Sequence, residues 1–528
     1  MSEKIKVTIN GKEILTTPDK TILQVAEENG IDIPHYCYHP GLPVAGNCRM
    51  CLVEVEGARK LQTACSTQVR DGMVVRTDTP QVKEAVRQVL EFMLINHPLD
   101  CPVCDQAGEC GLQDYYMEYG QYDPKFIENK NKKSKKATPI GKYVILDQER
   151  CILCARCVRF TRFITKTEEI GIFNRGDHSE VDLFPGKELN NRYTGNLVDI
   201  CPVGAMTCRD FRFKCRVWYL EEFDSICPGC SRGCNIKIYY NPHRPHKADG
   251  NRVLRFKPRF NPEVNRYWMC DDGRYGYKFI DENRIMYPLK GKEEVYLDEA
   301  INSFVSLLKE SIPDRTFYLL SANSTNEELF ATKKFFVDNY KLENIFLPDE
   351  DIFTGDRDDL LITEDKHPNT NGVKAIFNIL YKDLIKLDEL RELLEEKSIS
   401  LLIVNRHELP EDVLDFIKEN GIKLVYLGTN FNKTSKAADL VFPISVFAEK
   451  EGSFINVDKR FQKFSSRLEP LGVSMPEWVL FNRLSELMEF PVYYSSYMNI
   501  FKHMISEVGA FKNIDLNNIN KYGVLVEL

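Results

Sequence analysis

The most constraining feature of this sequence is the placement of its cysteines. All 17 cysteines of the 528-residue chain lie between Cys37 and Cys270, mostly in short-spaced groups. Iron–sulfur clusters are held by thiolates, commonly four for each cluster, from a tight loop plus one remote position. Four such groups can be assigned, so the first half of the chain is predicted to carry a series of redox centres. The second half contains no cysteine and needs a different explanation.

Composition and charge narrow the class of protein. Hydrophobic residues make up 43% and charged residues 28%, as in ordinary globular domains, and the length predicts several of them. The net charge of −8 argues against non-specific nucleic-acid binding, which needs a basic surface. No apolar run is long enough to span a bilayer, and the first residues show neither a signal nor a transit pattern. A cysteine-rich intracellular chain with an odd thiol count is expected to bind metal rather than to form disulfides.

Residues 1–78 are predicted to form a β-rich domain with a [2Fe–2S] cluster. Asn10-Gly11 is a hairpin signal between alternating segments, and a capping box at Thr21 begins a helix that Gly30 would close. Four cysteines follow with the spacing C-x10-C-x2-C-x13-C, namely Cys37, Cys48, Cys51 and Cys65. Hairpin, helix and cysteine loop follow one another in this order in ferredoxins. A structural zinc site is the alternative, because four thiolates also bind zinc.

Residues 79–140 are predicted to place a second cluster at the end of a helix. Thr79 is the N-cap, Pro80 takes the first helical position, and apolar residues recur at helical spacing. The helix leads into H-x3-C-x2-C-x5-C, formed by His97, Cys101, Cys104 and Cys110. Because a [4Fe–4S] cluster needs four ligands and no fourth cysteine is near, His97 is predicted to be a ligand. The basic run Lys130–Lys136 is predicted to be a solvated loop or linker.

Residues 141–219 are predicted to retain one [4Fe–4S] cluster of a two-cluster ferredoxin. Such ferredoxins carry C-x2-C-x2-C-x3-C-P twice, and the fourth cysteine of each run serves the other cluster. Here the first run has Thr161 as its fourth member, and the second run keeps only its last cysteine. The remaining ligands are Cys151, Cys154, Cys157 and Cys201. Alternation over residues 211–219 predicts a strand on which Cys215 is a small buried residue, and Cys208 is expected to be another non-ligand.

Residues 220–276 contain the last cysteine group. Cys227, Cys230, Cys234 and Cys270 have the spacing C-x2-C-x3-C-x35-C. Four thiolates could hold a third [4Fe–4S] cluster here, but zinc competes more strongly than at the first group, since C-x2-C knuckles with a remote ligand are common in zinc ribbons. The resemblance described below favours the cluster.

Residues 277–528 are predicted to form an α/β domain. Apolar runs at 399–404 and 424–427, separated by a helix over Glu411–Glu419, predict a parallel β-α-β unit. The segment has no glycine-rich phosphate motif and no nucleophile elbow. No catalytic residues are predicted in it.

In this order, the four groups resemble those of the large iron–sulfur subunits of bacterial NADH–quinone oxidoreductase (respiratory complex I). The resemblance covers residues 1 to about 276. It rests on the first cysteine spacing, on His97-Pro-Leu-Asp-Cys101-Pro-Val-Cys104, and on Tyr193-Thr-Gly-Asn-Leu-Val-Asp-Ile-Cys201-Pro-Val-Gly. The fourth group resembles the [4Fe–4S] module of molybdopterin oxidoreductases, and Phe447–Asn456 resembles a recurring segment of that superfamily.

The resemblance implies a multidomain α+β and α/β fold. Its parts are a β-grasp ferredoxin domain, a helical His/Cys segment, a ferredoxin-like domain with one cluster, and a truncated molybdopterin-oxidoreductase-like region. It also implies one [2Fe–2S] and three [4Fe–4S] clusters that relay electrons from a flavin- and NADH-binding subunit towards quinone. The other peripheral-arm subunits would be further partners. The chain would be cytoplasmic, without direct membrane insertion, and these subunits would attach it to the cytoplasmic face of the inner membrane.

Two departures from the molybdopterin enzymes matter. Asp272 stands where related formate dehydrogenases carry a lysine between the cluster and the pterin. The segment 277–528 is also shorter than the molybdopterin domain of those enzymes, and it contains no cysteine that could bind molybdenum. No molybdopterin is therefore expected, and the cluster at Cys227 and Cys270 is predicted to lie off the main electron path.

Three alternatives of other classes stay open. They are a catalytic formate-dehydrogenase-like subunit, the electron-input part of a hydrogenase, and a zinc-stabilised scaffold without redox function.

Overall fold

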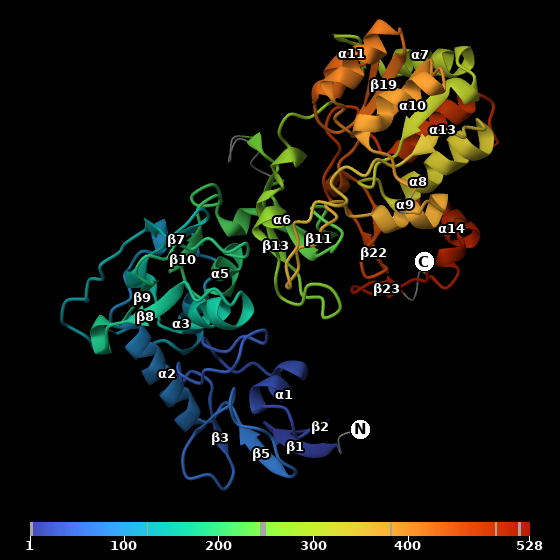
Figure 1. Ribbon diagram of the computed structural model, residues 1–528. Coiled ribbons are helices and arrows are strands. Elements are labelled where there is room, and N and C mark those ends of the chain that lie inside the picture. Colours follow the sequence, from blue (N-terminus) through green and yellow to red (C-terminus); the bar gives the residue numbers. More distant parts are fainter. Residues whose placement is uncertain (1–3, 124, 243–249, 381–382, 492–493, 516–518) are drawn as a thin grey trace. The chain divides into compact units, whose positions relative to one another are not determined.

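The computed structural model describes residues 4–123, 125–242, 250–380, 383–491, 494–515 and 519–528 (Figure 1). The chain forms two compact units, Met1–Leu220 and Glu221–Leu528. The finer division into five domains stays a prediction. Within the described ranges, no helix combines the length and the apolar character needed to cross a membrane.

The first unit begins with a five-stranded sheet and a short helix (Figure 1). The elements are β1 (Ile5–Ile9), β2 (Lys12–Thr16), α1 (Ile22–Glu28), β3 (Leu52–Val55), β4 (Gln62–Thr63) and β5 (Met73–Arg76), with strand order β2-β1-β5-β3-β4. The predicted hairpin is confirmed, because Asn10 and Gly11 take the positive φ values (50° and 80°) that suit its tight turn. The predicted capping box is also confirmed, since Thr21 and Gln24 exchange hydrogen bonds at the start of α1.

The helix α2 (Pro80–Leu94) leads from this sheet to the second cysteine group. It begins as predicted, with the Thr79 hydroxyl accepting the Val82 N–H at 3.3 Å and Pro80 in the first position. Its buried side chains join one hydrophobic cluster that also contains three cysteines. These cysteines come from three different predicted ligand sets: Cys37, Cys110 and Cys154.

The rest of the first unit folds around short elements that connect the cysteine loops. They are α3 (Gly111–Tyr119), β6 (Thr138–Pro139), β7 (Val144–Leu146), α4 (Arg156–Arg159), a π-helical turn (Phe160–Ile164), β8 (Ile170–Phe173), β9 (Glu180–Leu183), α5 (Gly195–Ile200) and β10 (Met206–Cys208). The strands β10, β7 and β6 form a three-stranded antiparallel sheet, and β8 pairs with β9.

The strand predicted over residues 211–219 is wrong. Phe213 has a left-handed backbone (φ 62°), which interrupts an extended run. Its N–H donates to the Asp105 carboxylate at 3.0 Å, so a long-range contact outweighs the alternating pattern. The chain then forms a short 3-10 helix at Val217–Tyr219. Cys215, expected to be buried on that strand, is half-buried and lies outside any strand.

The basic run Lys130–Lys136 is a loop, as predicted, and several of its side chains are exposed, but contacts with the rest of the chain hold it. The Lys130 ammonium donates to the Leu94 carbonyl at 3.0 Å, at the end of α2. The Lys136 ammonium pairs with the Asp100 carboxylate at 2.8 Å. The run therefore packs beside the second cysteine group.

The second unit opens with a small antiparallel sheet and continues into a larger mixed one (Figure 1). The small sheet and its neighbour are β11 (Glu221–Ile226), β12 (Asn235–Tyr240), β13 (Val253–Pro258) and α6 (Asp271–Tyr275). The larger sheet has the order β15-β14-β20-β19-β18-β16-β17, with β14 (Leu289–Lys290), β15 (Glu293–Glu294), β16 (Thr316–Leu319), β17 (Ile345–Phe346), β18 (Leu401–Asn405), β19 (Lys423–Gly428) and β20 (Leu440–Pro443). The predicted parallel unit is confirmed, because β18 and β19 are parallel neighbours joined through α11 (Glu411–Glu419).

Further helices and a third sheet complete the second unit. They are α7 (Leu297–Glu310), α8 (Asn326–Thr332), α9 (Thr370–Phe377), α10 (Leu390–Glu396), α12 (Lys433–Ala437), β21 (Gly452–Ile455), β22 (Arg460–Phe464), α13 (Glu477–Leu487), α14 (Tyr497–Glu507) and β23 (Val524–Leu525).

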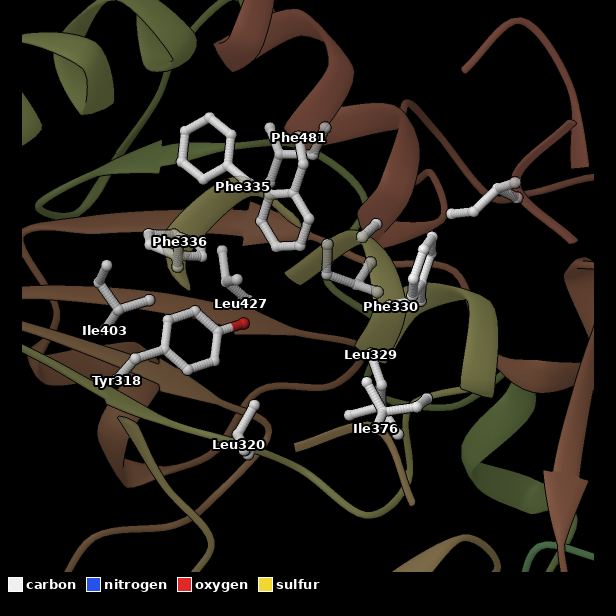
Figure 2. Packing of buried hydrophobic residues seen from close by; sticks show 14 of the residues in the cluster. Tyr318, Leu320, Leu329, Phe330, Phe335, Phe336, Ile376, Ile403, Leu427 and Phe481 are labelled. Atoms are coloured by element: carbon white, nitrogen blue, oxygen red, sulfur yellow. The ribbon is translucent and has the colours of Figure 1, made fainter. Parts of the chain in front are cut away.

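Aromatic side chains fill the core of this unit, between strands and helices (Figure 2). The rings of Phe335 and Phe481 stack with centroids 5.7 Å apart, and Phe336 meets Phe481 edge-on at 5.5 Å. Tyr318 of β16 lies 4.8 Å from Phe336, ring centroid to ring centroid. These contacts fix the helices against the sheet.

Replacing Phe336 by alanine tests this core. The side chain is fully buried, so Phe336→Ala should lower the free energy of unfolding by about 3–5 kcal/mol, measured by urea denaturation. The matched control is Phe353→Ala, whose ring is 56% exposed and whose loss should cost less than about 1 kcal/mol. Equal effects of the two substitutions would contradict the described packing.

Candidate metal centres

The first ligand set is gathered by the loop between α1 and β3 and by Cys65, the second residue after β4. Cys37, Cys51 and Cys65 are buried and Cys48 is half-buried. The Cys48 sulfur accepts the Cys37 N–H at 3.4 Å. Interaction with the neighbouring thiols lowers the pKa of Cys37 and raises the pKa of Cys48. All four predicted ligands of the [2Fe–2S] cluster therefore lie together.

The second ligand set lines one cavity of about 520 Å³. His97, Cys101, Cys104 and Cys110 all face it, together with apolar side chains of α2. Burial, followed by the charge of Arg150, lowers the pKa of His97 to about 4, so the imidazole is neutral at pH 7. Its Nδ1 is buried without a hydrogen-bond partner. A neutral imidazole with an unused nitrogen fits the predicted role of a metal ligand.

A glycine from the third group closes this cavity. A Cβ atom on Gly204 would lie 2.1 Å from the Cys104 sulfur and 3.3 Å from the Cβ of Gln106. No side chain fits there, so the glycine of Cys201-Pro-Val-Gly lets the two cysteine groups approach each other. Nearby, the Gly111 N–H donates to the Pro202 carbonyl at 3.1 Å, joining the residues that directly follow Cys110 and Cys201.

Buried and half-buried basic side chains surround the second set. Arg150, only 4% exposed, donates to the Asp100 carboxylate at 3.2 and 3.0 Å and lines the cavity. Arg216 donates to the Cys104 carbonyl at 2.6 Å, which explains why the segment around Phe213 folds onto this loop. These positive charges favour ionised thiols next to them.

The third ligand set lines an enclosed apolar cavity. Cys151, Cys154, Cys157 and Cys201 face one another across it, among β7, α4 and the residues before β10. Burial raises the pKa of all four thiols, that of Cys154 to about 11. A main-chain amide points at one of the sulfurs, because the Leu153 N–H donates to the Cys151 sulfur at 3.4 Å.

The loop of the third set has an unusual backbone. Leu153 and Ala155 both have left-handed φ values, 55° and 58°. Such alternation turns successive amides to one side, forming a concave surface that favours an anionic group. At the position of the missing fourth cysteine, the Thr161 side chain is fully buried and donates to the Val158 carbonyl at 3.2 Å.

The fourth ligand set lies in the second unit, in the loop between β11 and β12 and at the N-cap of α6. Cys227, Cys234 and Cys270 are buried and Cys230 is half-buried. The Cys227 N–H donates to the Cys234 carbonyl at 2.8 Å, and the Cys270 sulfur accepts the Gly273 N–H at 3.3 Å.

A glycine also separates two sulfurs of the fourth set. A Cβ atom on Gly273 would lie 2.8 Å from the Cys227 sulfur and 3.5 Å from the Cys270 sulfur. Burial raises the pKa of Cys270 to about 12, with the nearby Cys230 thiol as the next cause. Asp272, at the position of the lysine in the related enzymes, is exposed.

The sequence reasoning did not identify the roles of Gly204, Gly273 and the arginines next to the cysteines. A signal for the arginines was present, because Arg150 directly precedes the third cysteine run and Arg156 and Arg159 lie within it. Within the described ranges, there is no group of three or more His, Cys, Asp or Glu side chains whose arrangement could hold a metal ion. The four ligand sets therefore stay predictions that rest on spacing and proximity.

Five family models match successive parts of the chain. Their descriptions are 2Fe-2S iron-sulfur cluster binding domain (residues 2–80), NADH-ubiquinone oxidoreductase-G iron-sulfur binding region (87–125), NADH-quinone oxidoreductase subunit 3 ferredoxin-like domain (141–207), molybdopterin oxidoreductase Fe4S4 domain (220–282) and molybdopterin oxidoreductase (407–487). Each predicted ligand set lies inside one of the first four matches. The chain thus contains [2Fe–2S] and [4Fe–4S] domains followed by a molybdopterin-oxidoreductase region.

Curated relatives match somewhat less than two thirds of the chain. The G subunit of NADH-quinone oxidoreductase from Rickettsia conorii is 40% identical over 333 residues, which cover 62% of this chain and 48% of the relative. The G subunit from Streptomyces coelicolor is 40% identical over 339 residues, which cover 63% of this chain and 39% of that relative. The chain therefore spans about half or less of the length of these relatives. A crystal structure of an NAD+-reducing [NiFe]-hydrogenase matches with a TM-score of 0.37 and 28% identity, covering 40% of this chain and 91% of that one.

Replacing Gly204 by alanine tests the approach of the second and third ligand sets. The added methyl group would collide with the Cys104 sulfur, so G204A should lose about four iron atoms per chain after anaerobic purification. The control is Gly111→Ala, whose added methyl group would meet its nearest atom at 3.7 Å and should leave the iron content unchanged. Full iron content in G204A would contradict the described contact.

Proposed function

We propose that this chain is an electron-transfer subunit of the peripheral arm of an NADH–quinone oxidoreductase. Its similarity to the G subunits of such enzymes and the order of its iron–sulfur domains support this function. The proposed cofactors are one [2Fe–2S] cluster on Cys37, Cys48, Cys51 and Cys65, and three [4Fe–4S] clusters on the other three ligand sets. When bound, such clusters exchange single electrons without catalysing a further reaction.

The observation that carries the proposal is the shared core of the first three ligand sets. Cys37, Cys110 and Cys154 belong to one hydrophobic cluster, although up to 117 positions separate them in the sequence. The Tyr36 hydroxyl donates to the Gly111 carbonyl at 3.3 Å, so the residues next to Cys37 and Cys110 are in contact. Together with the bond between Gly111 and Pro202, this contact connects all three sets through neighbouring backbone. Short, rigid connections between redox centres are what a relay of electrons needs.

The protein environment fits anionic clusters at these places. Amide groups directed at sulfurs and buried arginines both stabilise negative charge, and they tune the reduction potential of a bound cluster. The neutral imidazole of His97 removes one negative charge from the second site, which favours its reduced form.

The proposed partners are a flavin- and NADH-binding subunit, which supplies single electrons, and other peripheral-arm subunits on the quinone side. The chain itself has no recognisable flavin or nicotinamide motif. We propose that these partners attach it to the cytoplasmic face of the inner membrane.

The α/β region of the second unit is proposed to work without a molybdopterin cofactor. In parallel sheets a ligand binds at the carboxyl ends of strands where the strand order reverses, which here lies between β16 and β18. Side chains of the chain itself occupy this place. The Arg406 guanidinium lies 2.7 Å from the Glu477 carboxylate and donates to the Ser324 hydroxyl at 2.8 Å, and Asn405 also donates to Ser324 at 3.3 Å.

Without a pterin partner, the cluster at Cys227 and Cys270 has no obvious electron acceptor in its own unit. It is therefore proposed to lie off the main path and to stabilise the fold of the second unit.

Two cysteine substitutions test this assignment in the assembled complex. Cys154→Ala should abolish NADH-driven quinone reduction, because it removes a ligand from the middle of the relay. Cys230→Ala should leave the turnover of each assembled complex within about twofold of wild type, while lowering the yield of assembled complex. Turnover should be measured on membranes and normalised to the amount of complex. Unchanged turnover in C154A would refute the relay, and loss of turnover in intact C230A complex would place the fourth cluster on the path.

A further inference from the structure

Two guanidinium groups lie between the first and third ligand sets. Arg156 and Arg159 both belong to α4, which begins within the third cysteine run. Arg159 is 8% exposed and Arg156 is half-buried. Both side chains reach out of their own loop to the loop of the first set, more than 110 positions away in the sequence.

Arg159 joins ligands of two different sets directly. Its Nη2 donates to the main-chain carbonyl of Cys37, in the first set, and at 3.3 Å to that of Cys154, in the third set. Its Nη1 donates to the Pro43 carbonyl at 2.5 Å, and its Nε donates to the Ala155 carbonyl at 3.2 Å. One planar side chain therefore ties both cysteine loops together with four hydrogen bonds. Only arginine has enough donors in a fixed plane to do this.

Arg156 makes a parallel connection. Its Nη2 donates to the carbonyl of Tyr38, next to Cys37, and its Nη1 donates at 3.0 Å to the carbonyl of Ile200, next to Cys201. The Asn47 side chain adds a third link between the same loops by donating to the Leu153 carbonyl at 3.2 Å.

The charges of the two arginines are not balanced by carboxylates. Among the described residues, neither guanidinium forms an ion pair with an Asp or Glu side chain. Carbonyl groups accept all four hydrogen bonds of Arg159 and two of Arg156, whose buried Nε has no partner. Carbonyl groups do not neutralise a buried charge, which is costly unless an anion lies near. The acidic side chains nearest in the fold are the ligand cysteines of the two sets. Arg159 contacts the main chain of Cys37 and Cys154, and Arg156 contacts the residues next to Cys37 and Cys201.

We infer that Arg159, assisted by Arg156, is a positioning residue that fixes the [2Fe–2S] site against the neighbouring [4Fe–4S] site and raises the reduction potential of both. This inference rests on the proposed electron-transfer function. A fixed positive charge beside a cluster stabilises its reduced form, which carries one more electron. When the guanidinium and the cluster are several ångströms apart in a partly solvated interior, the charge changes the ratio of reduced to oxidised cluster on the order of tenfold.

The test uses the full chain, purified anaerobically, in three variants. Arg159→Gln removes the charge and most donors, and Arg159→Lys keeps the charge but cannot bond four carbonyls. The control is Arg162→Gln, the same chemical change one turn further, on a side chain that is 55% exposed. Iron content, reduction potentials from EPR-monitored titration, and the distance distribution between the two reduced clusters from pulsed dipolar EPR are measured for each.

In R159Q, the ratio of reduced to oxidised cluster at a fixed ambient potential should fall about tenfold at both sites, a shift of about 59 mV for a one-electron couple. In R159K, the ratio of reduced to oxidised cluster should stay within about twofold of wild type at both sites. The distribution of distances between the two reduced clusters should broaden. R162Q should match the wild type in every measurement.

Potentials in R159Q that equal those of R162Q would overturn the tuning role. A distance distribution in R159K as narrow as in the wild type would overturn the positioning role. This measurement tests that role even if R159Q takes up no iron. A wild-type chain without iron would instead refute the proposed function itself, so the two failures are distinguishable.

Discussion

A thiolate buried in an apolar interior is stable only if positive charge or hydrogen-bond donors lie beside it, and this constraint organises the first unit. The hydrophobic cluster that α2 completes contains cysteines from three ligand sets. Burial raises the pKa of Cys110 to about 11 and that of Cys154 likewise, so without cations these thiols would stay protonated. Iron supplies most of the missing positive charge in the proposed function. Arginines and directed amide groups supply the rest, and they also hold the loops in place.

The same constraint explains why the sites are close to each other. Each cysteine loop has too few residues to bury its own sulfurs, so the loops cover one another. Gly204 of the third group closes the cavity of the second, and arginines of the third group reach the loop of the first. Most of the covering contacts are hydrogen bonds to main-chain carbonyl groups, from guanidinium groups, a main-chain amide and the side chains of Tyr36 and Asn47, and they leave the distances between the sites little freedom. A relay of electrons depends on such fixed distances.

Local features of the fold could be predicted from the sequence because they depend on neighbours in the chain. The turn at Asn10-Gly11, the N-cap at Thr79 and the helix over Glu411–Glu419 all follow from patterns a few residues long. The grouping of cysteines into sets also followed from spacing, because a cluster requires several ligands within one loop. The incorrect strand over residues 211–219 shows the limit, since a hydrogen bond from Phe213 to Asp105, 108 positions away, decided that conformation. The close approach of Gly204 to Cys104 has no local signature for the same reason. Arg159 is visible in the sequence as a basic residue within the third cysteine run, but its distant partner Cys37 is not.

The most direct test of this account counts metals in the full chain after anaerobic purification. Iron, labile sulfide, zinc and molybdenum should be measured per chain. One [2Fe–2S] and three [4Fe–4S] clusters predict about 14 iron atoms, a similar amount of sulfide, and no molybdenum. About 10 iron atoms with one zinc would assign the Cys227 set a structural role only and leave the relay of three clusters intact. A chain that contains zinc but no iron, or that carries stoichiometric molybdenum, would contradict the account.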